Sequence, residues 1–252
     1  MRLIPYTCAV LALISTGCNS PQREPPSGST AASMSNESPS DVRLPVTVGK
    51  KCGFIDGTGK LVINPQYEYV EAFSEGLAMV CIGECDADHR IMGYRIRPNS
   101  GEREWLERSF KFGFIDGTGK LVINPMFEWA QAFREGLAAV CVGQGCYGID
   151  LQHPSEIREQ KWGYIDKAGA MVIPPQFDHA QSFHDGLASV SVGGKVGYID
   201  KAGRFVINPQ FAYGEDFDRG IAHVAIGKLE QTDAMQYGYI DKTGKYIWQP
   251  SN

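Results

Sequence analysis

The sequence predicts an all-β fold: a tandem array of five three-stranded antiparallel β units in a β-meander solenoid, with a closed propeller-like ring as the alternative. An alternating strand precedes each repeat of a short phrase, and an apolar strand ending in Pro follows it. The phrase itself is Gly-aromatic-Ile-Asp-x-x-Gly, and its copies begin at Gly53, Gly113, Gly163, Gly197 and Gly238. Self-similarity of this kind is the signature of a repeat architecture.

Composition and charge narrow the class of protein. The chain has 252 residues, of which 43% are hydrophobic and 21% charged, as in an ordinary globular or repeat-built domain. Its 24 Lys and Arg against 29 Asp and Glu give a net charge of −5, without a basic stripe. Nucleic-acid binding depends on Lys and Arg that neutralise phosphates, so we expect no nucleic-acid partner.

Residues 1–17 resemble a signal peptide. Arg2 precedes an apolar run, and Ser15-Thr16-Gly17 places small residues before Cys18. This ending resembles a bacterial lipobox, in which Cys18 becomes the acylated first residue of a lipoprotein. An ordinary secretory signal is the alternative. We therefore expect an exported protein of the bacterial cell envelope, lipid-anchored or else secreted or periplasmic and soluble.

Residues 18–41 are predicted to form the lipidated cysteine and a disordered tether, and residues 42–250 the repeat domain. Between residues 19 and 41 the only large apolar side chain is Met34. Such a segment cannot bury enough surface to offset its ordering entropy. A flexible tether of this length reaches roughly 25 Å, which would hold the domain just off a membrane.

Each copy of the phrase is predicted to be a strand that runs into a hairpin turn. Its Asp accepts backbone N–H groups in the turn, and the Gly three residues later adopts positive φ. The returning strand follows, for example from Lys60 to Pro65. Because Pro cannot donate to a β-ladder, we expect each returning strand to end or bulge at this step.

A third strand in each unit alternates in polarity. Ala78, Val80 and Ile82 lie on one predicted face, and the opposite face varies between units. A period of two with one face always apolar predicts a half-buried strand. One unit alone buries too few apolar side chains to offset the entropy of ordering its residues. Neighbouring units must therefore share a core.

Three insertions fall at one joint of the repeat, between the alternating strand and the next copy of the phrase. They span residues 84–109, 144–160 and 228–236. The first is predicted to contain an extended hairpin, with a turn at residues 98–101 and Trp105 on its second strand. Because the joint is the same each time, we expect the insertions to project from one side of the array.

The copy Lys-Trp-Gly-Tyr-Ile-Asp-Lys-Ala-Gly at residues 161–169, with Phe-His-Asp-Gly-Leu-Ala at 183–188, resembles the WG-repeat (KWG) proteins. The resemblance covers about residues 46–250. The defining Trp is present at Trp162 and is replaced in the other copies by Cys52, Phe112, Val196 and Tyr237. The family is abundant in bacteria, often exported, and without an established activity, so the resemblance implies a fold far more than a function.

Four cysteines lie at the roots of two insertions. Cys81 and Cys141 are equivalent residues of neighbouring units, about 14 Å apart for units three strands wide, which is too far for a bond. In an oxidising compartment the local pairs Cys81–Cys85 and Cys141–Cys146 are the predicted disulfides. Reduced buried thiols and a metal site of four thiolates are the alternatives. Cys52 is predicted to be a small core residue.

Other candidate chemistry has simpler explanations. His179 occupies an aromatic packing position, and His184 a variable one that we expect to be exposed. The Gly-Thr-Gly-Lys sequence at 57–60 lacks the spacing and following helix of a phosphate loop. No nucleophile motif stands out. The sequence therefore predicts no catalytic residue, metal or cofactor, and we do not expect an enzyme.

The prediction for function is a binding or scaffolding module. Its predicted contact surface is the insertion side, where aromatic and guanidinium groups suit an interface. The candidate residues are Tyr94, Arg95, Arg97, Trp105 and Arg108. We expect a protein partner; binding of carbohydrate or peptidoglycan through exposed aromatic side chains is the alternative. An enzyme with a site between units is a third hypothesis.

Overall fold

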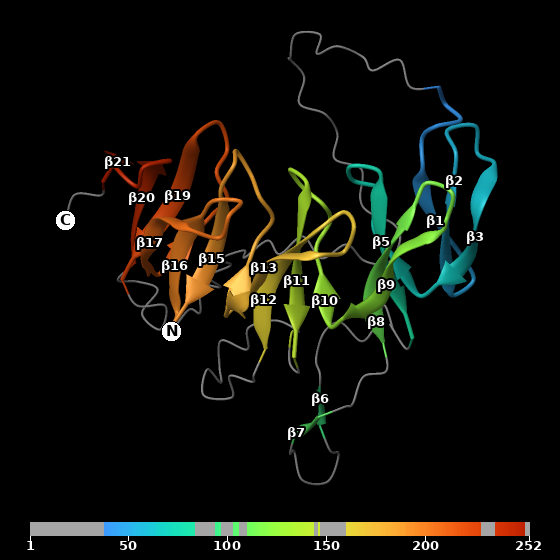
Figure 1. Cartoon of the computed structure of the whole chain (residues 1–252), viewed down its shortest axis with the longest axis horizontal. Coiled ribbons are helices and arrows are strands. Elements are labelled where there is room, and N and C mark those ends of the chain that lie inside the picture. The colour runs from blue at the N-terminus through green and yellow to red at the C-terminus, as the bar shows by residue number, and fades with distance from the viewer. Residues whose placement is uncertain are drawn as a thin grey trace, which may run out of the picture.

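The computed structural model describes residues 38–83, 94–96, 103–105, 110–143, 146, 160–227 and 235–249. All regular structure in these segments is β. Five sheets follow one another along the long axis, and we name them units I to V in chain order (Figure 1). Units I and V lie at opposite ends, so the described strands form an open array and not the closed ring (Figure 1).

Every unit contains the three predicted strands. The alternating strands are β1 (Leu44–Val48), β5 (Leu77–Ile82), β11 (Leu137–Val142), β15 (Ala188–Val192) and β19 (Ile221–Ile226). The central strands, which carry the repeated phrase, are β2 (Lys51–Ile55), β8 (Lys111–Asp116), β12 (Lys161–Asp166), β16 (Lys195–Ile199) and β20 (Gln236–Asp241). The returning strands are β3 (Leu61–Tyr67), β9 (Leu121–Phe127), β13 (Met171–Phe177), β17 (Phe205–Phe211) and β21 (Tyr246–Trp248).

Units II to V also have a fourth strand, which the sequence did not predict. These edge strands are two residues long, and each pairs antiparallel with the following alternating strand. They are β4 (Tyr69–Val70), β10 (Trp129–Ala130), β14 (His179–Ala180) and β18 (Tyr213–Gly214). Two residues are too few to show a period, which is why no pattern indicated them.

The hairpin turns have the predicted chemistry. Asp56 Oδ1 accepts hydrogen bonds from the backbone amides of Thr58 (2.9 Å) and Lys60 (3.0 Å), and Gly59 has a φ of 87°. The hydroxyl of Thr58 also donates to this carboxylate, and this hydrogen bond holds the pKa of Asp56 below its usual value. The repeated Asp is therefore a turn residue.

The returning strand bulges at its Pro, as predicted. Cys52 pairs with Tyr67 and Phe54 with Ile63, so three residues including Pro65 lie opposite the single Gly53. A Cβ atom on Gly53 would lie 2.4 Å from the carbonyl oxygen of Ile63. The first Gly of the phrase is thus required by the close approach of the returning backbone.

The hydrophobic cores lie between the units. At the seam between units III and IV, Trp162, Tyr164 and Ile173 from unit III form one buried cluster with Val190 and Ile199 from unit IV. Across the described residues there is one such cluster at each of the four seams. The shared core that the sequence predicted is confirmed.

This arrangement corrects the prediction of half-buried alternating strands. In β5 both Val80 and Cys81 are fully buried, although they point to opposite faces. One face of the strand packs on the preceding unit and the other on the following unit. A strand inside a stack therefore has no solvent face, which a period of two in one isolated unit cannot reveal.

Each seam also contains a pair of aromatic rings in edge-on or tilted contact. The second residue of the phrase in one unit contacts the Phe that precedes the Gly turn of the next unit. The ring centroids are 4.8–5.0 Å apart in the pairs Phe54–Phe73, Phe114–Phe133, Tyr164–Phe183 and Tyr198–Phe217. Units II, III and IV thus each contribute one ring to the preceding seam and one ring to the following seam.

Candidate functional site

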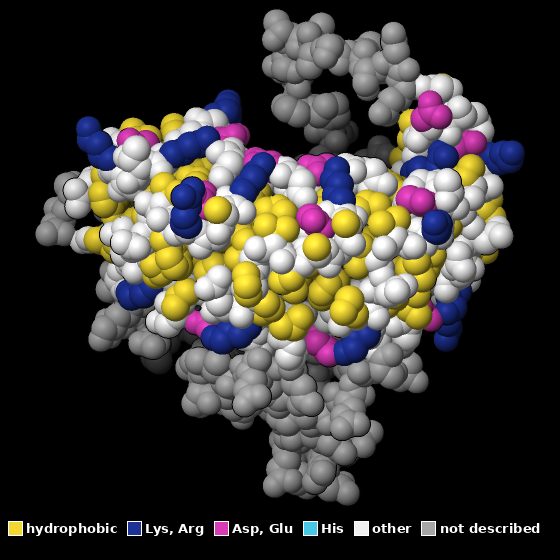
Figure 2. All heavy atoms as spheres, viewed as in Figure 1, with side chains coloured by type: hydrophobic (Ala, Val, Ile, Leu, Met, Phe, Trp, Pro, Cys, Tyr) yellow, Lys and Arg dark blue, Asp and Glu magenta, His cyan; other side chains and the backbone are white. Residues whose placement is uncertain are grey.

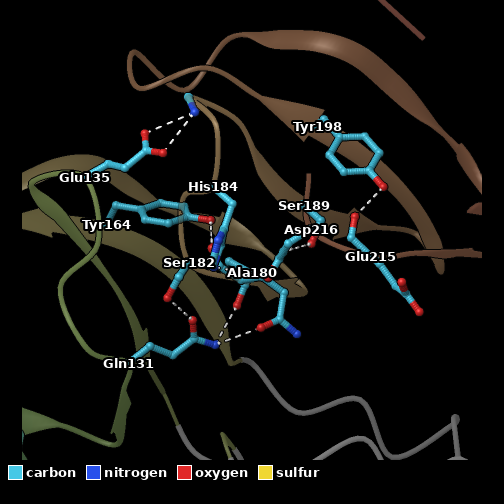
Figure 3. A network of polar contacts seen from close by, with 12 residues as sticks. Gln131, Glu135, Tyr164, Ala180, Ser182, His184, Ser189, Tyr198, Glu215 and Asp216 are labelled. Atoms are coloured by element: carbon cyan, nitrogen blue, oxygen red, sulfur yellow. Dashed lines mark hydrogen bonds and ion pairs between the residues drawn. The ribbon is translucent and has the colours of Figure 1, made fainter. Parts of the chain in front are cut away.

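The turn that precedes each alternating strand connects its unit to the next one. Glu135 has a φ of 51°, and its carboxylate accepts a hydrogen bond from the backbone amide of Gly186 at 3.1 Å (Figure 3). The same carboxylate lies 3.1 Å from Lys201 Nζ. The same kind of contact recurs at the neighbouring seams, between Glu75 and both Gly136 and Lys167, and between Asp185 and Gly220. Because the contact repeats with the units, we assign it to assembly of the array.

A second set of polar contacts runs through the seam between units III and IV. Gln131 Nε2 donates a hydrogen bond to the carbonyl oxygen of Ala180 (3.2 Å), and Ser182 Oγ donates to Gln131 Oε1 (2.9 Å) (Figure 3). The phenol of Tyr164 donates to the carbonyl oxygen of Gln181 at 2.7 Å. These groups satisfy one another across the seam.

Ser, Asp and His side chains meet at the seam between units IV and V, in an order that does not suit nucleophilic catalysis. Ser189 Oγ donates to Asp216 Oδ1 at 3.2 Å, and His184 Nε2 lies 3.6 Å from Asp216 Oδ2 (Figure 3). In a catalytic triad the imidazole lies between Ser and Asp and takes the serine proton. Here the carboxylate lies in the middle, and Ser189 is buried.

Burial raises the pKa of Asp216 above its usual value, against the opposing influence of the His184 charge. His184 itself is half-buried, so the expectation that it would be exposed is wrong. The reason is that Asp216 of the following unit lies beside it. His179 does occupy the predicted aromatic position, where it contacts the ring of Trp162 at a centroid distance of 5.2 Å.

The insertions leave the array from equivalent places. The strands that flank each insertion are paired antiparallel up to the joint, at Ile82 with Lys111, Val142 with Lys161 and Ile226 with Gln236. In unit IV the same joint is closed by the two-residue turn Gly193-Gly194. The three insertions therefore leave their units at equivalent joints, and their projection from one side of the array stays a prediction.

The first insertion contains the predicted hairpin. Its strands β6 (Tyr94–Ile96) and β7 (Arg103–Trp105) pair antiparallel, with Tyr94 opposite Trp105 and Arg95 opposite Glu104. The hairpin stands apart from the five sheets (Figure 1). Three of the five candidate residues are thus on this hairpin, whereas Arg97 and Arg108 lie outside the described residues.

The predicted disulfide at the second insertion is present. Cys141 and Cys146 are bonded, with Cα atoms 5.9 Å apart, at the root of the second insertion. Cys81 is buried and disulfide-bonded, but its predicted partner Cys85 lies outside the described residues, as does Cys18. Cys52 is buried in the core, as predicted, and is also disulfide-bonded. Among the side chains that the structure describes, no group of three or more His, Cys, Asp or Glu could hold a metal ion.

Hydrophobic side chains are also exposed on the array. Figure 2 shows them gathered in a band across the middle of the face in view, with charged side chains mainly along its two margins. The returning strands contribute exposed apolar residues at repeated positions, among them Leu61, Leu121, Met171 and Phe205. In the described part of the chain, no helix has the length and hydrophobicity that a bilayer span requires.

Unit V differs from the others in a way that sequence reasoning missed. Tyr239 is 45% exposed, whereas Phe54, Phe114, Tyr164 and Tyr198 at the same position are fully buried. Trp248 is 55% exposed where the other units have a buried Ile. A signal was available: aromatic residues replace smaller apolar ones at several positions of the last unit.

The comparisons agree with this repeat architecture. The family model for the WG containing repeat matches residues 53–84, 112–146, 162–195 and 197–229. Each match begins on a central strand, so the matched repeats are offset from the structural units, which start at an edge or alternating strand. No curated protein matches the chain. With five units in phase and four matched repeats, the chain belongs to the family of WG-repeat proteins.

Proposed function

We propose that this WG-repeat protein is a non-enzymatic binding and scaffolding module of the bacterial cell envelope, and that it holds a partner protein through its insertion side. The observation that carries the proposal is the common origin of the three insertions. They leave units II, III and V at equivalent joints, so a partner can contact all three from one side. Repeat arrays commonly use such extended surfaces for binding.

The hairpin β6–β7 supplies the proposed centre of this surface. It stands apart from the sheets (Figure 1), and its sequence combines Tyr94, Arg95 and Trp105. Tyr, Trp and Arg are the residue types that most often carry the energy of protein interfaces. Arg97 and Arg108 would extend the same surface. The scaffold beneath it consists of hydrogen-bonded strands with cores on both sides, which supports rigid presentation.

The non-enzymatic part of the proposal is supported by the seam between units IV and V. Ser189 and His184 there each lie against the carboxylate of Asp216, whereas nucleophilic catalysis places the imidazole against the serine. The recurring Asp of the phrase is engaged in its turn, as Asp56 shows.

The test removes the first insertion and leaves the strands of the array in place. Residues 84–109 are replaced by a Gly-Ser linker between Gly83 and Phe110, because Phe110 is buried in the core. The matched control carries the same linker between Gly193 and Gly194, at the joint of unit IV that has no insertion. We expect crosslinked partners from the envelope fraction to be lost with the first variant and retained with the control.

Point variants distinguish the loss of specific side-chain contacts from the effect of shortening the insertion. Trp105→Ala and Arg95→Glu are expected to weaken capture of the same partner, by about tenfold if either residue is an energetic centre of the interface. Recovery of an unchanged set of partners after exchange of all three insertions would contradict the proposal.

The location of the protein is part of the same proposal. The sequence of residues 1–18 supports export and acylation at Cys18, with residues 18–41 as the tether. Metabolic labelling with a fatty acid is expected to mark the protein and to fail with Cys18→Ser. Equal labelling of the two would refute the lipid anchor, and an unlabelled but exported protein would favour the secretory alternative.

A further inference from the structure

The outer face of unit V is an unusual surface for a repeat array. At each of the four seams, the face that carries the second residue of the phrase is buried against the next unit. In unit V the same face is open to solvent. Tyr213, Tyr237, Tyr239 and Trp248 on it are all at least 40% exposed.

The pairing of the strands places these side chains in two rows on one face of the sheet. Tyr213 pairs with Ala225, which pairs with Tyr237; His223 pairs with Tyr239, which pairs with Trp248. We call Tyr213, His223, Tyr237, Tyr239 and Trp248 the ring face.

The rings of this face contact one another and form a continuous surface. His223 is stacked on Tyr237 with a centroid distance of 5.3 Å and an interplanar angle of 17°, and its ring centroid is 5.0 Å from that of Tyr239. The Tyr239 centroid is 6.5 Å from that of Trp248. Contacts among the rings hold each of them in place before any ligand arrives, which lowers the entropy cost of binding.

Polar groups lie beside the rings. The hydroxyl of Tyr213 donates to Glu215 Oε1 at 3.0 Å, and His223 Nδ1 lies 3.5 Å from the same oxygen. The Glu215 side chain is half exposed. Burial and the hydrogen bond to Glu215 raise the pKa of Tyr213 to about 12, so its hydroxyl remains a donor even in mildly alkaline solution. The face therefore offers a carboxylate, an imidazole and phenol hydroxyls around an aromatic surface.

From this combination we infer that the ring face binds a glycan, with the C–H faces of pyranose rings on Tyr237, Tyr239 and Trp248 and sugar hydroxyls on Glu215 and His223. A pyranose has an apolar face of C–H groups and a periphery of hydroxyls, so its ligand site needs flat aromatic rings with hydrogen-bonding groups beside them. The ring face supplies both.

A second copy of the chain does not fit this face in the head-to-tail sense. At every internal seam the next unit inserts a Phe against the ring, as Phe217 does against Tyr198. Residues 38–43, which precede β1 in unit I, include no aromatic residue. A copy stacked through unit I would therefore leave Tyr239 without the ring contact that the internal seams provide.

The test measures binding of two soluble probes, the β-1,4-linked hexamers of glucose and of N-acetylglucosamine, to the purified protein. We expect at least one hexamer to bind in calorimetry and to shift the aromatic NMR signals of Trp248 and Tyr239. Trp248→Ala and Tyr239→Ala are expected to weaken binding by about tenfold or more, and Trp248→Phe to retain most of it. Met126→Ala is the control, because Met126 is exposed on β9, away from the ring face.

Failure of both hexamers to bind at millimolar concentration, or binding that survives Trp248→Ala and Tyr239→Ala together, would overturn the inference. A dimer in sedimentation that Trp248→Ala dissociates would also overturn it, in favour of a contact between two ring faces. The variant with the linker in place of residues 84–109 is expected to bind the hexamer normally. Glycan binding and partner binding can therefore fail independently.

Discussion

The phenol of Tyr198 donates a hydrogen bond to the backbone carbonyl oxygen of Glu215 in the following unit, over 2.8 Å. Phe54 and Phe114 fill the same buried position without a hydroxyl. Tyr198→Phe should therefore keep the ring contact with Phe217 and lose the hydrogen bond, at a cost of about 1 kcal/mol in the free energy of unfolding. Denaturant titration measures this cost. An unchanged free energy would show that the bond contributes nothing at the seam.

The glycine of the phrase gives a second prediction. A Cβ atom on Gly163 would lie 2.5 Å from the carbonyl oxygen of Ile173. We expect Gly163→Ala to destabilise the protein by about 1–3 kcal/mol, because the backbone of the returning strand must move. Gly117→Ala is the matched control, since a Cβ there meets nothing within 4 Å. Equal effects of the two substitutions on the thermal midpoint would contradict this explanation.

In the turns before the alternating strands, the residue that precedes the Gly has a positive φ. Replacing this residue by Gly should change stability by an amount that depends on its contacts. Glu135 and Arg219 both have a φ of 51°, which favours glycine, but Glu135 contacts the next unit through Gly186 and Lys201. Arg219→Gly is expected to raise stability by up to about 1 kcal/mol, because it relieves backbone strain. Glu135→Gly should gain less or lose stability, since the seam contact disappears. High salt should narrow the difference between the variants by screening the Lys201 pair.

The disulfide at the second insertion closes a short loop between Cys141 and Cys146. On the loop-entropy model such a bond contributes about 2 kcal/mol. Cys146→Ser should therefore lower the stability of the oxidised protein by about that amount. Once a reductant has opened the bond, the wild type and the variant should unfold at similar denaturant concentrations. A large remaining difference under reducing conditions would assign the effect to packing of the Cys146 side chain.

His179 should make stability depend on pH. Burial lowers the pKa of its imidazole below the usual value of about 6.5. As the pH falls below 6.5, the unfolded state takes up the proton first, so the contribution of this group to stability decreases down to the folded pKa. His179→Tyr places the residue of Tyr69 and Tyr213 at this position and should remove that part of the decrease. Parallel stability curves from pH 8 to 5 would contradict the prediction.

Much of the array could be predicted from local sequence. The hairpin turns depend on Asp56 and its counterparts, whose hydrogen bonds are made within five residues. The bulge at Pro65, the position of the insertions and the Cys141–Cys146 bond are likewise set by neighbours in the chain. Sequence patterns reveal such features because the residues that interact lie close together in the chain.

The burial of the remaining residues depends on contacts between neighbouring units. Cys81 is buried because the next unit covers its face, and His184 is half-buried because Asp216 lies beside it. The exposure of Tyr239 has the same origin, since its sequence context Gly-Tyr-Ile-Asp is shared with the buried Tyr164 and Tyr198. Identical local sequence can therefore have opposite environments, and only the stacking order distinguishes them.

At every seam a ring of one unit contacts a Phe of the next unit. All seams therefore run in the same direction along the chain and have similar chemistry. A unit such as IV, which follows its predecessor after 34 residues between Gly163 and Gly197, meets the same kind of surface wherever it is inserted. Recombination between repeats in phase could therefore lengthen or shorten the array without redesigning an interface. The surfaces at its two ends would keep their chemistry while the distance between them changed in steps of one unit.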